Sequence, residues 1–349
     1  MSGINIISCP LESVGGHIGS HSGIFMIHDR NVEGLVKKMG VDARGTFALE
    51  ATDEHKTLAT VMEIERWLLE SGADRDAFVL GVGGGVTTDI TGFAASVYKR
   101  GVRFGFVPTT LLSQVDAAIG GKNGVNLDSY KNIIGVIRQP EMTFICPEPL
   151  ATLPYQQLLS GAAELLKTFI ISNKCNEYER SVNMLADLRT KALEGAAEKA
   201  VQEYSQTLRE LISAAAKVKA GIAGRDPEEH GERRLLNLGH TFAHSIEKNS
   251  GESVGHGMAV AMGIILAARL GEALGLAENG LTARLKKDFT ACGLPIESPF
   301  SIAVLADAMK KDKKAAGDVV HFVIPLSIGR VETRDLKVED AVRILEKEC

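Results

Sequence analysis

The 349-residue sequence contains few cysteines and no paired-cysteine motif. Its five cysteines are scattered along the chain without CxxC spacing: Cys9, Cys146, Cys175, Cys292 and Cys349. An odd number of isolated cysteines is typical of free thiols in a reducing compartment. The pattern indicates neither a disulfide framework nor a thiolate metal site.

The sequence also lacks long apolar runs, a signal peptide and an excess of basic residues. It has no uninterrupted apolar run of the ~18 residues that a membrane-spanning helix needs. Its first residues, MSGINIISCPLESVGG, have neither the basic start nor the apolar stretch of a secretory signal. A formal net charge of −5 argues against nonspecific nucleic-acid binding. We therefore expect a cytoplasmic protein with no membrane and no nucleic-acid partner.

The composition is that of an ordinary globular protein, with 45% hydrophobic and 24% charged residues. The length exceeds what one core usually fills, so two domains with a cleft between them are expected. Residues 1–150 alternate short apolar runs with amphipathic stretches, which predicts an α/β domain with a mainly parallel sheet. Residues 151–349 are rich in Ala, Leu, Glu and Lys, which predicts a mainly helical second domain.

Five strands and four long helices can be assigned from the pattern of apolar residues. The strands are expected at 23–28, 46–49, 77–82, 103–108 and 142–147, and the helices at 55–72, 88–99, 195–221 and 255–275. The last of these helices is apolar nearly all round, so we expect it to be buried.

A glycine-rich turn lies between a strand and a helix in VLGVGGGVTTD (79–89). Glycines allow a diphosphate to approach the backbone, and the N-terminus of the following helix offers free N–H donors. The turn therefore predicts nucleotide binding, although a tight strand-to-helix turn is the alternative. The spacing matches neither G-x-G-x-x-G nor a Walker loop. Asp29 follows a predicted strand, where it can bind a ribose or simply cap a helix.

The segment 100–135 is dense in polar side chains around glycines. They are Arg100, Thr109, Thr110, Asp116, Lys122, Asn126, Lys131 and Asn132. Lys122 follows two glycines, so its ammonium can be displayed from a loop to a phosphate. Any single lysine here is more often a solvated surface charge, but the cluster favours an anion site.

Glu164, His240 and His256 lie in three predicted helices and offer one carboxylate and two imidazoles. Three protein ligands leave a coordination position open, as in a catalytic metal site. Spacing alone favours a different pair, because His240 and His244 lie four apart on one helix. Glu164 and Lys167 can also form an ordinary intrahelical ion pair.

Eight motifs taken together resemble the 3-dehydroquinate synthase family. They are GGGVTTDITGFAA (83–95), YKRGVRF (98–104), VPTTLLSQVDAAIGGKNGVN (107–126), KNIIG (131–135), LATLP (150–154), GAAELLK (161–167), LLNLGHTFAH (235–244) and GHGMAV (255–260). The resemblance implies a nucleotide-binding α/β domain with a mostly parallel sheet, an all-helical metal-binding domain and a homodimer. It also implies one bound NAD and one divalent metal, zinc or cobalt.

The activity that the resemblance implies is conversion of 3-deoxy-D-arabino-heptulosonate 7-phosphate into 3-dehydroquinate and phosphate, the second step of the shikimate pathway. The reaction combines transient oxidation by NAD, loss of phosphate, re-reduction, ring opening and aldol closure. Two competing interpretations are that the protein is another sugar-phosphate cyclase or a metal-dependent polyol dehydrogenase. A non-enzymatic binding module is a more distant one, because it needs no hydride acceptor beside an open metal site.

The resemblance also implies a role for individual residues. The metal ligands become Glu164, His240 and His256, which moves His244 from the metal to the substrate. NAD is expected at Asp29, Lys56, Gly84, Gly85, Asp89, Thr109, Thr110, Lys131 and Thr152, with Asp29 and Lys56 at the adenosine end. Substrate is expected at Asp116, Lys122, Asn132, Lys167, Lys219, Arg233, Asn237, His244 and one of Lys313 and Lys314, with Arg100 reaching the phosphate from the other subunit.

Three positions depart from the family pattern. Thr88 stands where a glycine is usual, Asp53 where a glutamate is usual, and Met258 where a glutamate often follows the HG pair. None of them removes an expected metal ligand or substrate cation.

Overall fold

The computed structural model describes residues 4–128, 130–251, 253–312 and 319–347. The chain divides into two compact units, one formed by Met1–Pro154 with Val201–Pro227, the other by Tyr155–Ala200 with Glu228–Cys349. The division near Pro154 lies close to the boundary expected at residue 150. Residues 201–227 differ from the expectation, because they group with the first unit. Tertiary contacts decide that membership, and helical periodicity carries no information about it.

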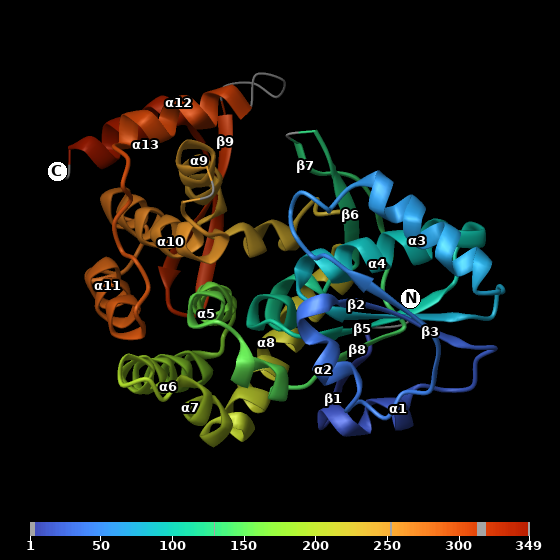
Figure 1. Ribbon diagram of the computed structural model, residues 1–349. Coiled ribbons are helices and arrows are strands. Elements are labelled where there is room, and N and C mark those ends of the chain that lie inside the picture. The colour runs from blue at the N-terminus through green and yellow to red at the C-terminus, as the bar shows by residue number, and fades with distance from the viewer. Residues whose placement is uncertain (1–3, 129, 252, 313–318, 348–349) are drawn as a thin grey trace. The chain divides into compact units, whose positions relative to one another are not determined.

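The first unit is built on a six-stranded parallel sheet in the order β1-β8-β5-β4-β2-β3 (Figure 1). The strands are β1 (Ile6–Ser8), β2 (Ile24–Asp29), β3 (Ala43–Leu49), β4 (Phe78–Gly83), β5 (Arg103–Pro108) and β8 (Met142–Ile145). All five strands expected from the sequence are therefore confirmed. Strand β1 was not predicted from the sequence, because it has only three residues and lies at the edge of the sheet.

Both faces of this sheet are covered. Alternate side chains of each strand point to opposite sides, so one strand contributes to two cores. In β4, Val79 enters a core that includes Ile64 of α3 (Leu58–Glu70) and Ala94 of α4 (Gly85–Val97). Phe78 and two further residues of β4 enter the core on the other face, together with Phe144 of β8. Parallel sheets are stable only when both faces are buried in this way.

The order of the strands places a ligand-binding position at the end of β4. The chain runs from β2 outward to β3 and then returns past β2 to β4 on its other side. In open parallel sheets, ligands bind at the carboxyl ends of the strands where the strand order reverses. Here that position is the turn after β4, which carries the three glycines at residues 83–85.

Short helices, one long helix and a hairpin complete the first unit. The remaining elements are η1 (Leu11–Ser13), α1 (Val14–His17), η2 (Arg30–Val32), α2 (Glu33–Val36), η3 (Tyr98–Arg100), η4 (Ser113–Ala117), β6 (Lys122–Leu127), β7 (Tyr130–Ile137), η5 (Glu148–Thr152) and α8 (Ser205–Arg225). The antiparallel hairpin β6–β7 forms part of the segment expected to be a glycine-flanked loop. Its polar residues concealed the strand pattern.

The second unit is mainly helical, with one antiparallel hairpin. Its elements are α5 (Tyr155–Ile170), α6 (Cys175–Leu193), η6 (Glu232–Asn237), α9 (His240–Ser250), α10 (His256–Ala273), α11 (Leu281–Cys292), α12 (Ile302–Asp312), β9 (Val319–Ser327), β10 (Arg330–Lys337) and α13 (Val338–Glu346), while α7 (Ala197–Glu203) crosses the division between the units. The hairpin β9–β10 makes this unit less than all-helical.

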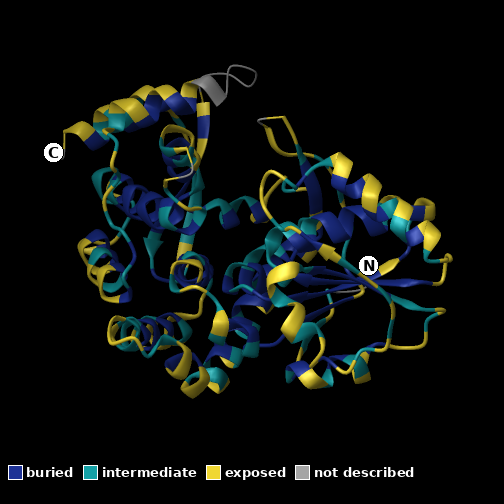
Figure 2. Cartoon of the chain, in the orientation of Figure 1, coloured by how far each residue is buried: buried dark blue, intermediate teal, exposed yellow. Residues whose placement is uncertain are grey.

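Helix α10 lies at the centre of the second unit, as its apolar sequence predicts. Figure 2 shows it largely as buried, and it packs against α5, α9, α11, α13 and β9. Among the described residues, no helix has both the length and the apolar character required to cross a membrane.

Glu65 on α3 gives a pH-dependent prediction for the stability of the fold. Burial raises the pKa of this half-buried carboxyl to about 7, above its ordinary value of 4.5. The folded state therefore holds a proton more tightly than the unfolded state, and stability falls as the pH rises from about 4.5 to about 7. Glu65→Gln is expected to remove this loss. After allowance for solvent screening the gain is about 1 kcal/mol, or roughly 2 °C in Tm.

Thermal unfolding of Glu65→Gln at pH 5 and pH 8 checks this prediction. The gain in Tm over the unsubstituted protein is expected at pH 8 and should be close to zero at pH 5. Glu63→Gln, at an exposed position on the same helix, is the matched control. An equal gain at both pH values would contradict the prediction.

Candidate functional site

The glycine-rich turn brings several of the expected cofactor residues together in the first unit. Gly84 precedes the first turn of α4, and Gly85 begins the helix. The backbone N–H of Thr109 donates to the carbonyl of Gly83 at 2.9 Å. A Cβ at Gly84 would lie 3.2 Å from Cγ2 of Thr110, so the 109–110 segment lies directly beside the turn.

Glycine is required in β4 itself because α4 packs directly on that strand. A Cβ at Gly83 would lie 2.4 Å from the hydroxyl oxygen of Thr87, and one at Gly81 would lie 2.8 Å from that of Thr91. The turn thus presents the N-terminus of α4, with its free N–H groups and favourable dipole, at the carboxyl edge of the sheet. This arrangement suits an anionic ligand such as a diphosphate.

A buried lysine links the glycine-turn helix to the β6–β7 hairpin. Nζ of Lys56 donates to Oδ2 of Asp89 at 2.5 Å and also to Oδ1 of Asn132. Burial raises the pKa of Asp89 to about 6, although the nearby Lys56 ammonium opposes this rise. Lys56 was expected near the adenosine end of NAD. It contacts Asp89, which was expected to bind the cofactor, and Asn132, which was expected to bind the substrate.

A second ion pair in the first unit joins Asp116 to Lys219. Asp116 lies in η4, a single π-helical turn, and Lys219 comes from α8. Nζ of Lys219 donates to Oδ1 of Asp116 at 2.5 Å and to its backbone carbonyl at 2.8 Å. Single π-helical turns occur often at functional sites. Both residues were expected at the substrate, although they are 103 positions apart in the sequence.

The other expected residues of the first unit make more local contacts. Asp29 caps η2 by accepting from the N–H of Asn31 at 2.9 Å, which is the helix-cap alternative. Lys131 forms an exposed ion pair with Asp53 at 2.7 Å. The hydroxyl of Thr152 donates to the nearby carbonyl of Pro149.

Two cations of the first unit are exposed at the ends of elements. Lys122 begins β6, and Arg100 ends η3 with a left-handed φ of 70°. Lys313 and Lys314, one of which was expected to bind substrate, lie outside the described residues.

Glu164, His240 and His256 converge within the second unit from α5, α9 and α10. One potential ligand atom from each residue lies within 4.8 Å of the others. Oε1 of Glu164 lies 3.5 Å from Nε2 of His256 and 3.8 Å from Nε2 of His240. His240 and His256 each begin a helix, and Nε2 of each ring lies within 4 Å of Glu164 on α5.

The opposite nitrogen of each histidine ring is held by an oxygen. Nδ1 of His240 lies 3.2 Å from the backbone carbonyl of Leu238, and Nδ1 of His256 lies 3.2 Å from Oε1 of Glu247. When each ring is neutral and carries its proton on Nδ1, both Nε2 lone pairs face Glu164. This is the orientation that histidine ligands adopt around a metal ion.

The ionisable groups around Glu164 keep its carboxylate charged and shift the pKa values of the two histidines in opposite directions. Burial alone would raise the pKa of Glu164, but Lys167, His256 and His240 hold it well below its usual range. Burial lowers the pKa of His240 to about 3, and the Lys167 ammonium adds to this effect. Burial opposes protonation of His256 as well, yet the adjacent carboxylates of Glu164 and Glu247 raise its pKa to about 10.

This donor set fits a divalent cation. Both carboxylate oxygens of Glu164 are buried, and among the described residues neither accepts a hydrogen bond of ordinary geometry. The ammonium of Lys167 contacts Oε2 as an ion pair. One carboxylate oxygen and two imidazole nitrogens are ligands that zinc and similar metals prefer. Three ligands also leave a position open for a substrate oxygen.

His244 lies beside this cluster without being one of its three members. Its ring centroid is 5.6 Å from that of His240 in an edge-to-face arrangement. The i, i+4 pair favoured by spacing alone is thus adjacent on α9, but the third convergent ligand atom comes from His256. Arg233, buried in η6, and Asn237 at the end of η6 also belong to this unit.

Two glutamates of the second unit that contact candidate site residues were not predicted from the sequence. Glu229 accepts from Nδ2 of Asn237 at 2.6 Å, and its backbone is left-handed with φ 63°. It precedes a 3₁₀ helix, so no regular spacing could have indicated it. Glu247 follows His240 by seven residues on α9, a spacing of two helical turns that does place both residues on one face.

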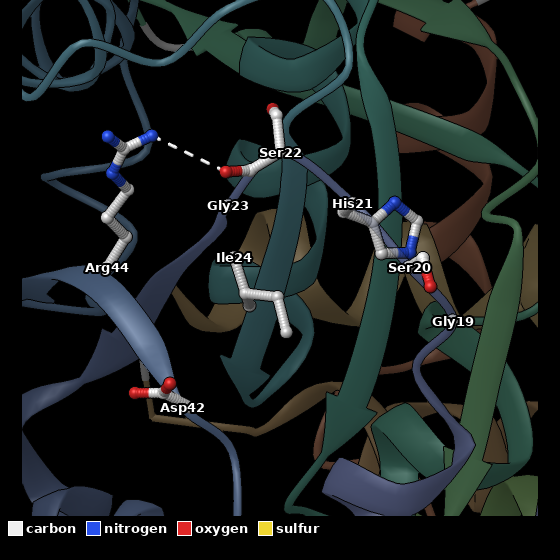
Figure 3. A pocket seen from close by; sticks show the side chains of 8 residues that line it. All are labelled: Gly19, Ser20, His21, Ser22, Gly23, Ile24, Asp42 and Arg44. Atoms are coloured by element: carbon white, nitrogen blue, oxygen red, sulfur yellow. Dashed lines mark hydrogen bonds between the residues drawn. The ribbon is translucent and has the colours of Figure 1, made fainter.

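A surface pocket in the first unit lies at the wrong edge of the sheet to be this site. It has a volume of about 480 Å³ and is lined by residues 19–24, Asp42 and Arg44 (Figure 3). It adjoins Ile24, the first residue of β2, whereas the glycine turn follows the carboxyl end of β4. Arg44 is engaged there with the backbone carbonyl of Ser22.

The departures from the family pattern have different local consequences. The buried hydroxyl of Thr88 donates to the carbonyl of Gly85 at 3.0 Å, so it bonds within its own helix. Asp53 is the partner of Lys131. Met258 is half-buried on α10, next to the close contact of Gly257 with α5.

The fold and the candidate metal cluster are those expected of a cyclase enzyme that is structurally similar to solved sugar-phosphate cyclases. The structure resembles 2-epi-5-epi-valiolone synthase from Streptomyces hygroscopicus subsp. jinggangensis, solved with NAD⁺ and Zn²⁺, with a TM-score of 0.82, 26% identity and coverage of 100% of this chain and 98% of that one. It matches 2-deoxy-scyllo-inosose synthase in fold with a TM-score of 0.82, 23% identity and 99% coverage of both chains.

Sequence comparison identifies the family within this class. Residues 46–160 match the N-terminal part of 3-dehydroquinate synthase, and residues 161–315 match its C-terminal part. The 3-dehydroquinate synthase of Pyrococcus abyssi is 40% identical over 293 residues, which cover 84% of this chain and 82% of the relative. The chain belongs to the 3-dehydroquinate synthase family.

Proposed function

We propose that this enzyme converts 3-deoxy-D-arabino-heptulosonate 7-phosphate into 3-dehydroquinate and phosphate, using one NAD and one zinc or cobalt ion. The observation that carries the proposal is the convergence of Glu164, His240 and His256 in a chain of this family. When bound, the metal supplies Lewis-acid stabilisation to a substrate hydroxyl, and NAD accepts a hydride and returns it. The classification as a carbon–oxygen lyase follows from the loss of phosphate.

Glu164, His240 and His256 hold the metal in this proposal. The two Nε2 atoms and the buried carboxylate supply three ligands, and Lys167 balances the second carboxylate oxygen. A buried carboxylate paired with cations is stable only while they remain in place. Lys167 is therefore suited to hold the charge balance of the site and to contact a substrate hydroxyl.

NAD binding is assigned to the carboxyl edge of the first unit's sheet. Gly84 and Gly85 allow the diphosphate to approach the N-terminus of α4, and Thr109 and Thr110 lie beside them. Asp89 follows one turn later on the same helix. Asp29, Lys56, Lys131 and Thr152 remain assigned to NAD from the family resemblance.

Substrate binding is assigned to polar groups from the family resemblance. The resemblance implies that Arg233 and Lys219 bind the carboxylate, and the guanidinium of Arg233 is suited to donate two parallel hydrogen bonds to it. Asn237 and His244 orient hydroxyl groups, with Asn237 fixed by Glu229. Lys122, Asn132 and Arg100 bind the phosphate, and Asp116 positions Lys219. The requirement for a carboxylate-binding pair favours this substrate over neutral-tailed sugar phosphates.

A homodimer is part of the proposal. Large apolar side chains remain exposed on α3 and β7 of the first unit: Leu58, Met62, Leu69, Tyr130, Ile133 and Ile137. Exposed apolar groups on neighbouring elements are typical of protein interfaces, and a two-fold dimer uses one such surface twice. Arg100 is exposed on the same unit, so it is available to the active site of a second copy.

Product analysis tests the proposed function against its competitors. Purified enzyme with a trace of NAD and added zinc or cobalt is supplied with the heptulosonate phosphate, and phosphate and NADH are both measured. Multiple turnovers of phosphate release without net NADH are expected. Accumulation of one NADH per substrate would indicate a polyol dehydrogenase. Turnover of glucose 6-phosphate or sedoheptulose 7-phosphate in its place would indicate another cyclase.

A further inference from the structure

Glu247 presents a carboxylate to the metal cluster from behind His256. It lies in the last part of α9, and its side chain is only 26% exposed. Its Oε1 lies 3.2 Å from Nδ1 of His256, the ring nitrogen on the far side from Glu164. This contact therefore involves one of the three proposed metal ligands.

The contact determines which nitrogen of His256 can bind a cation. A carboxylate accepts hydrogen bonds and cannot donate one when ionised, so the proton of the neutral ring must be on Nδ1. Nε2 then carries the lone pair, and it is Nε2 that lies 3.5 Å from Oε1 of Glu164. A histidine in the other tautomer would place an N–H where the metal ligand is needed.

The two histidines of the cluster are held by oxygens of different charge. His240 faces the neutral backbone carbonyl of Leu238, whereas His256 faces an ionisable side chain. A carboxylate behind a ligating imidazole both fixes the ring and increases its basicity. The side chain of Glu247 is the part of this arrangement that mutation can remove without altering the backbone.

We propose that Glu247 is a positioning residue that holds His256 in the Nδ1-protonated tautomer and thereby strengthens metal binding at Nε2. This inference rests on the metal centre of the proposed function. Loss of Glu247 leaves all three ligands in place but releases the ring of His256. Removal of such outer partners typically weakens metal affinity by about 10- to 100-fold.

Metal affinity, measured independently of turnover, tests the role of Glu247. The dissociation constant for Zn²⁺ is measured by competition with a chromophoric chelator in the unsubstituted protein, Glu247→Ala and Glu247→Gln. Glu247→Ala is expected to bind Zn²⁺ about 10- to 100-fold more weakly. Glu247→Gln is expected to recover part of the affinity, because its amide oxygen can still accept from Nδ1. The visible spectrum of bound Co²⁺ should change in Glu247→Ala.

Asn249→Ala is the matched control on α9. The amide of Asn249 donates to the carbonyl of Ser245 in the same helix, so its loss perturbs α9 without touching a ligand. Its Zn²⁺ affinity should be unchanged. Equal affinity in Glu247→Ala and the unsubstituted protein would overturn the inference. So would an equal loss in Asn249→Ala, because that result indicates a purely structural effect. Absence of Zn²⁺ and Co²⁺ binding by the unsubstituted protein would instead refute the metal centre itself.

Discussion

The protein with His256→Ala is expected to lose its divalent metal and its activity together. His256 contributes one of the three ligand atoms that converge among the described residues, and its Nε2 lies 3.5 Å from Oε1 of the buried Glu164. Its removal should weaken metal affinity well beyond the roughly 10- to 100-fold associated with an outer partner. Metal content after dialysis, measured by atomic emission, checks the result.

The variant His244→Ala tests whether His244 is a metal ligand or only a neighbour of one. The ring of His244 lies against that of His240, but the structure groups His256 with Glu164 and His240. The variant should therefore retain metal while its turnover falls by about 10²-fold, the lower end of the range for a positioned acid or base. Metal retention by His256→Ala, or metal loss by His244→Ala, would show that the i, i+4 pair on α9 is the true ligand pair.

Gly257→Ala is expected to damage the metal centre without changing a ligand. A Cβ at Gly257 would lie 2.1 Å from the backbone oxygen of Ser160 on α5, so the two helices must move apart. Ser160 precedes Glu164 by one helical turn, and Gly257 directly follows His256. The displacement should therefore separate two metal ligands. Overpacking of this kind costs about 1–3 kcal/mol, and here it acts on backbone atoms.

Gly255→Ala is the matched control two residues away. Among the described residues, its chain neighbours apart, no heavy atom lies within 4 Å of a Cβ placed at Gly255, and its φ of −68° suits alanine. Its thermal stability and Zn²⁺ affinity should stay close to those of the unsubstituted protein, whereas both should fall in Gly257→Ala. Normal Zn²⁺ affinity in Gly257→Ala would contradict the proposed dependence of the site on close packing between α5 and α10.

The sheet and the main helices could be predicted because periodicity reports burial directly. The strand expected at 103–108 matches β5 residue for residue, and the apolar stretch at 255–275 corresponds to α10. The hairpin β6–β7 could not be predicted in the same way. Most of β7 is exposed, so its sequence does not alternate clearly between apolar and polar residues. The division between the units likewise depends on contacts of α8 that have no local signature.

The spacing of residues in the sequence predicts only part of the candidate site. Ligand chemistry offered Glu164, His240 and His256, spacing along α9 favoured His244 in place of His256, and the family resemblance decided for His256. The structure then added the orienting contacts, because Leu238 and Glu247 matter through the direction of a ring. Similarly, the family resemblance implied Asp116 and Lys219 as substrate contacts, but their pairing depends on how α8 packs against η4.

The most direct test of the proposed function is simultaneous measurement of phosphate and NADH with the heptulosonate phosphate as substrate. With one zinc ion per chain and NAD well below the substrate concentration, many equivalents of phosphate should be released while absorbance at the wavelength of NADH stays flat. Release that stops after one equivalent per NAD, with matching NADH accumulation, would contradict the assignment of this chain as a cyclase that regenerates its cofactor.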